Sequence, residues 1–182
     1  MNRDPQLNKV SQQMTVDPRL EIARKQIEFA RQYTRSLIDN LDDSVWFTIP
    51  PGSPTHIAWQ VGHLGMAEYG LCLFRMRGRQ PEDTELMSSK FRKRFSRGST
   101  PDPDASNNPT PDEIRGVFDH VHETALAAIG SYSDELLDEP VDEPYAAFAT
   151  KYGALLFCSH HEMIHAGQIG LLRRLLDLPP IR

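Results

Sequence analysis

The sequence has few cysteines and no long apolar run, and each shortage excludes a class of protein. Only two of the 182 residues are cysteine, Cys72 and Cys158, and they lie far apart in the chain. They cannot form the disulfide framework of a small secreted domain, so we expect a reducing, cytoplasmic setting. No stretch approaches the roughly 20 apolar residues of a membrane span. Nor does an apolar segment follow the early charges of residues 1–5 as in a signal peptide.

An excess of positive charge is also missing. Lysine and arginine number 20 against 25 acidic residues, which gives a net charge of -5. This balance provides no general attraction to nucleic acid or to an anionic membrane. Residues 90–97, Lys-Phe-Arg-Lys-Arg-Phe-Ser-Arg, are a local exception. We interpret them as a solvated helix face, and phosphate contact with nucleic acid is the weaker alternative.

Apolar residues recur at helical spacing in four long stretches. The expected helices cover about residues 17–41, 53–77, 110–132 and 150–176. The clearest start is Thr-Pro-Asp-Glu at 110–113, a capping box with proline in the first helical position. Asp17 before Pro18 is the expected cap of the first helix, and Ser53 before Pro54 is the expected cap of the second. Charged residues of the first helix are expected on its polar side: Arg24, Lys25, Glu28, Arg31 and Arg35.

These helices predict an all-α four-helix bundle. No strand alternation, internal repeat or Asn-Gly hairpin signal stands out. Residues 98–112 contain three prolines before Thr110 and are expected to form a long crossover loop. We expect residues 1–16 to be a flexible N-terminal arm and residues 17–182 to form one bundle domain. Such bundles build their sites from side chains on facing helices.

Histidines provide the main chemical signal. His161 and His165 lie four residues apart on one helix face, so both can direct a ring nitrogen at one metal ion. Catalytic metal sites commonly use three protein ligands and keep one position open. We choose His63 as the third ligand because it lies within a helix beside the small residues Gly62 and Gly65, which permit close approach. The alternative is that all three are ordinary hydrogen-bonded or core histidines.

Three further residues are assigned to the surroundings of this site. Gln168 follows His165 by three residues, which places its amide on the same helix face. Trp59 precedes His63 by one turn and would form an aromatic wall, or simply part of the core. His56 is about 10.5 Å from His63 along the helix axis, too far to bind the same ion. We expect it at the pocket mouth, with an ordinary surface histidine as the alternative.

The spacing from His161 to His165 also matches zinc proteases, in which Glu162 would be the general base. Position 171 is leucine rather than a downstream ligand, and no glutamate follows residue 162. We therefore consider the protease interpretation weak. Glu162 is turned by about a third of a circle from His161. We favour a polar surface residue or a support for the metal ligands.

Two segments together resemble the DinB-like superfamily of bacterial four-helix-bundle proteins. They are residues 57–64, Ile-Ala-Trp-Gln-Val-Gly-His-Leu, and residues 161–168, His-Glu-Met-Ile-His-Ala-Gly-Gln. They occur in the family's order, on predicted helices, and the resemblance covers roughly residues 18–178. It implies an up-down-down-up bundle, which suits the long crossover. It also implies a three-histidine metal site formed by His63, His161 and His165.

Characterised relatives include thiol-dependent S-transferases and a mycothiol-dependent isomerase. The resemblance thus implies a divalent transition metal, with Zn²⁺ or Ni²⁺ first, that activates a low-molecular-weight thiol. A related domain in the sulfoxide synthases of thiohistidine biosynthesis has a glutamate where this chain has Gly167, so we do not expect that role.

Our leading hypothesis is a metal-dependent thiol transferase acting on a small-molecule substrate. Metal-dependent hydrolysis comes second, and a non-catalytic metal-binding or partner-binding bundle is the alternative from a different class. A homodimer stays open as an assembly.

Overall fold

The computed structural model describes residues 17–142 and 145–181, and the expected N-terminal arm lies outside them. Within these residues the regular structure is helical, apart from one isolated bridge between Pro140 and Thr150. The prediction of an all-α fold is therefore confirmed. None of the helices in these ranges has the length and apolarity to cross a membrane.

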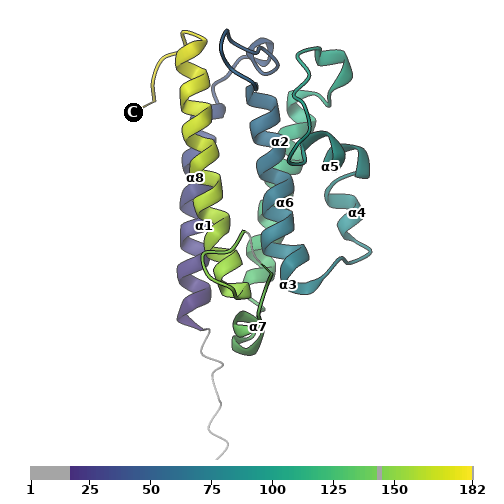
Figure 1. The fold of residues 1–182 in the computed structure, drawn as a ribbon, viewed down its shortest axis with the longest axis vertical. Coiled ribbons are helices and arrows are strands. Elements are labelled where there is room, and N and C mark those ends of the chain that lie inside the picture. The colour runs from purple at the N-terminus through teal and green to yellow at the C-terminus, as the bar shows by residue number, and fades with distance from the viewer. Residues whose placement is uncertain (1–16, 143–144, 182) are drawn as a thin grey trace, which may run out of the picture.

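The two longest helices, α1 (Pro18–Ile38) and α8 (Lys151–Leu175), pack against each other and run in the same direction (Figure 1). Asp17 caps α1 as predicted, and Thr150 caps α8. At the other end, the guanidinium group of Arg173 donates to the carbonyl oxygen of Leu37 at 2.7 Å. This bond connects the C-terminal parts of both helices.

The second long segment is continuous but not uniform. It consists of α2 (Ile57–Glu68), a π-helical turn (Tyr69–Phe74) and α3 (Arg75–Arg77). Gly78, with φ of 73°, ends it at the predicted position because glycine adopts this backbone conformation without strain. The π-helical turn was not predicted. Such turns often occur near functional sites, since they redirect the side chains that follow.

The start of α2 differs from the prediction. Ser53 does not cap the helix, because its hydroxyl group bonds with the backbone of Thr55 instead. The cap is His56, whose Nδ1 accepts a hydrogen bond from the backbone N–H of Trp59 at 3.0 Å. The helix therefore begins three residues later than the Ser-Pro sequence suggests.

Short helices α4 (Asp83–Leu86) and α5 (Ser89–Phe95) lie along one flank (Figure 1). A crossover with a 3₁₀ turn at Ala105–Asn107 then leads to α6 (Pro111–Ile129), and α7 (Asp134–Asp138) leads to α8. The predicted capping box of α6 is present in full between Thr110 and Glu113.

The core lies between the four long segments, where α2 packs against both α6 and α8. Each large apolar side chain buried there contributes about 1.5–3 kcal/mol. The completely or almost completely buried residues include Ile27, Trp46, Leu64, Phe118 and Ile169. One prediction about this interior is wrong: Arg31, expected on the polar side of α1, is only 1% exposed. Its partners are acidic residues described below.

Candidate metal centre

The antiparallel contact of α2 and α8 brings His63 together with His161 and His165. One ring nitrogen of each lies within 4.8 Å of those of the other two. The Nε2 atoms of His161 and His165 are 3.1 Å apart. Two nitrogen ligands of one tetrahedral zinc ion are separated by roughly 3.3 Å. The spacing of these two imidazoles therefore fits a shared ion.

Hydrogen bonds hold two of the three rings with Nδ1 turned to the protein. Nδ1 of His63 donates to the backbone carbonyl oxygen of Phe95 at 2.8 Å. Nδ1 of His165 donates to Oε1 of Gln60, whose Nε2 donates in turn to the hydroxyl of Thr55 at 3.2 Å. A proton on Nδ1 leaves the lone pair on Nε2 free. This is the form in which imidazole binds a metal, with its other nitrogen fixed by a protein acceptor.

The environment keeps the three imidazoles neutral. Burial lowers the pKa of His161 to about 4, and the neighbouring His63 adds to this shift. Burial, together with the two other histidines, lowers the pKa of His165 to about 3. The pKa of His63 is also lowered by burial. Metal ligation requires neutral imidazole, so the site is in the correct protonation state at pH 7.

Two of the surrounding residues predicted from the sequence lie beside the cluster. The indole ring of Trp59 stacks on His63, with ring centroids 4.8 Å apart, and its Nε1 donates to Ser99 Oγ at 2.9 Å. Gln168 is exposed and lines a cavity together with His165 and Trp59. Both residues are thus within the neighbourhood of the proposed metal.

His56 occupies a different place from either expectation. It is 0% exposed, so the interpretation as a surface histidine is wrong. Its Nδ1 caps α2, and its Nε2 donates to the carbonyl oxygen of Asp102 at 3.1 Å. Both ring nitrogens are occupied, and the cavities beside the histidine cluster do not include it among their lining residues. Its role in the described structure is to join α2 to the crossover.

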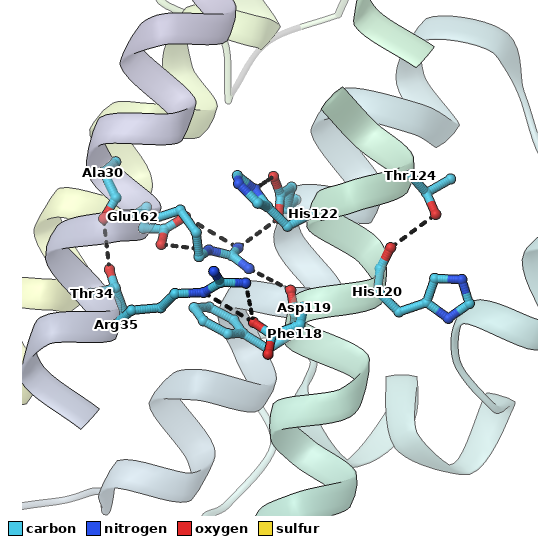
Figure 2. Close-up of polar contacts among 11 residues, drawn as sticks. Ala30, Thr34, Arg35, Phe118, Asp119, His120, His122, Thr124 and Glu162 are labelled. Carbon is cyan, nitrogen blue, oxygen red and sulfur yellow. Dashed lines mark hydrogen bonds and ion pairs between the residues drawn. The ribbon is translucent and has the colours of Figure 1, made fainter. Parts of the chain in front are cut away.

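Glu162 is turned into the core toward α1, so its interpretation as a surface residue is also wrong. It is 2% exposed, and its carboxylate accepts hydrogen bonds from Nε of Arg31 at 2.9 Å and from Nη2 of the same guanidinium group at 3.3 Å. Arg31 also binds Glu68 at 2.6 Å and the carbonyl oxygen of Phe118. Figure 2 shows Glu162 among the polar contacts that link α1, α6 and α8. Its carboxylate is committed to an ion pair.

Residues that orient the ligands were not identified from the sequence. Gln60 precedes His63 by three residues, so its position on the same helix face was a usable signal. The carbonyl group of Phe95 carries no sequence signal, because any residue at that position supplies one. The side chain of Phe95 is nevertheless fully buried, which fixes the position of this backbone group.

A second group of potential ligands lies deeper in the core. Glu68, Cys72 and Cys158 have ligand atoms within 4.8 Å of one another. The carboxylate of Glu68 already binds Arg31 and accepts a hydrogen bond from Nδ1 of His122. The contact with Cys72 and burial both raise the pKa of the Cys158 thiol. Since metals bind the thiolate, this group is a poor metal site.

Two cavities adjoin the three histidines. One, of about 380 Å³, is lined by His63 and His161, and the other, of about 470 Å³, by His165. Both fall within the range of small-molecule sites. The arrangement can therefore bring one or two small molecules to an ion held by the imidazoles.

The family model described as the DinB superfamily matches residues 26–169 of the chain, a range that includes all three histidines. No curated protein matches the sequence.

Proposed function

Because the family match shows that the chain belongs to the DinB superfamily, we propose that it is a divalent-metal enzyme that transfers a low-molecular-weight thiol to a small-molecule substrate. The convergence of three neutral imidazoles carries this proposal. Thiol transfer itself rests on the family resemblance, since a scaffold alone does not fix an activity. We also propose that α1, α2 with its continuation, α6 and α8 correspond to the family's up-down-down-up bundle.

His63, His161 and His165 would hold the ion, with Zn²⁺ or Ni²⁺ as the first candidates, because neutral imidazole suits both. When bound, the ion would lower the pKa of a coordinating thiol, so that thiolate forms at neutral pH. The protein supplies the orientation. Gln60 and the carbonyl group of Phe95 each hold one ring by its Nδ1 proton.

Metal analysis of protein purified without a histidine tag tests the first part of the proposal. We expect close to one equivalent of a transition metal, and its loss when His63, His161 or His165 is replaced by alanine. The matched control is His160→Ala, because His160 is an exposed histidine on the same helix. Less than about one tenth of an equivalent, unchanged by the three substitutions, would contradict a metal site.

Activity measurements with panels of thiols and electrophiles test the second part. We expect thiol-dependent turnover that disappears in His161→Ala and persists in His160→Ala. Turnover that needs water but no thiol would replace transfer by hydrolysis. Stoichiometric metal without turnover of either kind would indicate a non-catalytic metal-binding bundle.

A further inference from the structure

The cavity beside His63 and His161 combines an apolar wall with a positively charged rim. The wall is formed by side chains of α2, the π-helical turn and α8: Met66, Ala67, Leu71, Phe74 and Phe157. Arg75 and Arg97 are its charged lining residues, and none of the described residues that line it is acidic. Such a cavity favours an apolar molecule that carries a negative charge.

The two arginines meet at one residue. The guanidinium group of Arg75 donates to the carbonyl oxygen of Tyr145 at 3.0 Å. That of Arg97 donates to the hydroxyl group of Tyr145 and lies 5.7 Å from the centre of its ring. The ring of Tyr145 is 6.1 Å from that of Phe157, which in turn is 5.8 Å from that of His161. The rings of Tyr145 and Phe157 thus lie in sequence between the guanidinium group of Arg97 and His161.

Arg97 is the more accessible of the two charges. Its side chain is exposed, and none of the ion pairs found among the described residues includes it. It is also well placed, because the chain is anchored on both sides of it. Phe95 is buried and binds His63 through its carbonyl oxygen, and Ser99 binds the indole nitrogen of Trp59. The segment that forms the charged rim therefore also holds one of the candidate ligands.

We propose that the electrophilic substrate is an apolar carboxylate, with its carboxylate bound by Arg97 and its apolar body in this cavity. This inference rests on the proposed thiol transfer. In that reaction the thiol proton is released to solvent and a C–S bond forms. The bond between the carbon and its leaving group breaks, and the leaving group takes the electron pair. Guanidinium binds carboxylate with two parallel hydrogen bonds, which would fix the direction of the substrate.

The cavity next to His165 then remains for the thiol. Its lining supplies several hydrogen-bonding side chains, including those of Ser53, Thr55, Ser99 and Gln168. A small polar thiol suits this side better than the apolar side. The two substrates would approach the histidines from different cavities.

A pair of probes of matched shape tests the inference without any turnover. Binding of 4-phenylbutyrate and of its neutral amide, 4-phenylbutanamide, is measured by calorimetry on the metal-loaded protein and on the chelator-treated protein. We expect at least about tenfold tighter binding of the carboxylate, as for a charge-assisted hydrogen-bonded pair. In Arg97→Gln the carboxylate should weaken to the affinity of the amide. Arg92→Gln, an exposed arginine of α5 outside the cavity, should keep the preference.

A second variant locates the binding. Apart from Gly70's own stretch of helix, no atom lies within 4 Å of a Cβ built on this residue, which lines the cavity, so Gly70→Leu should place its side chain in the cavity. It should weaken both probes. Equal affinity for acid and amide, or a preference that survives in Arg97→Gln, would overturn the inference. That result with normal metal content would leave the proposed function standing. If the protein binds no metal but keeps the Arg97-dependent preference, the proposed metal-dependent function would fail while the binding of an apolar carboxylate in this cavity would stand.

Discussion

Replacing Arg31 by methionine tests the buried ionic contacts that join three of the long helices. The side chain of Arg31 is 1% exposed and pairs with Glu68 on α2 and Glu162 on α8. Its guanidinium group also lies 3.4 Å from the centre of the Phe118 ring on α6. Methionine has a similar length and can fill much of the space. It leaves two carboxylates in the core without their positive partner.

The expected cost follows from this burial. Removing one partner of a buried ion pair typically costs about 3–5 kcal/mol, because the remaining charge is neither hydrated nor neutralised. Domains are stable by only about 5–15 kcal/mol, so the variant should lose a large part of its free energy of unfolding. For a chain of this size the melting temperature should fall by about 6–20 °C. The matched control is Arg35→Met one turn along α1, because the Arg35–Asp119 pair is 39% and 43% exposed. It should cost no more than about 1 kcal/mol.

Urea unfolding followed by circular dichroism at pH 7 in chelator measures both variants. The triple variant Arg31→Met, Glu68→Gln, Glu162→Gln should recover most of the lost stability, since no uncompensated charge remains in the core. The deficit of Arg31→Met should also shrink as the pH falls, because protonation neutralises the two acids. A loss no greater than that of Arg35→Met, or a triple variant no more stable than the single one, would refute this reasoning.

Three further predictions concern α2 and its cap. Gly62→Ala places a methyl group 2.6 Å from the ring of the buried Phe95; we expect thermal unfolding to show a loss of about 1–3 kcal/mol. Gln60→Leu removes the acceptor of the His165 Nδ1 proton; competition with a metal-binding dye should show an affinity about 10–100-fold lower at unchanged helical content. His56→Asn keeps a side chain that can cap a helix but removes a group whose pKa burial lowers from 6.5 to about 4. Since the unfolded chain binds this proton first, the natural protein loses stability as the pH falls from 6.5 to 4, and the melting temperature of the variant should fall less over that range.

Helix boundaries were predictable where the signal is local. The side chains of Thr110 and Glu113 each accept a hydrogen bond from the backbone N–H of the other residue. Because the two residues are only three positions apart, both bonds can be predicted from the sequence. The cap of α2 shows the limit of such rules. Ser53 before Pro54 has the preferred residue types, but its hydroxyl group is used in a local turn, and the ring of His56 caps the helix instead.

In the candidate site, too, only the local relationships between residues could be predicted from the sequence. His161 and His165 are related by one helical turn, so their common face follows from their spacing. The position of His63 depends on how α2 packs against α8, and it was chosen from its small neighbours and from a family resemblance. Arg31 could not be placed in this way, because its acidic partners lie 37 and 131 residues away. On a helix with several other charged residues, an arginine of this kind is indistinguishable in sequence from an exposed one.

The geometry of α8 explains why the glutamate of the His-Glu-x-x-His spacing has a structural role here. Residues 161 and 165 share a face, so residue 162, turned by about 100°, must point to a different neighbour. That neighbour is α1, where Arg31 occupies the carboxylate. A glutamate held in this way cannot also accept a proton from a substrate in the cavities beside the histidines. Its influence on the site must be indirect, through the position of the helix that carries His161 and His165. A group that accepts a proton beside the three imidazoles must therefore come from the substrates, from solvent or from the cavity walls, and not from Glu162.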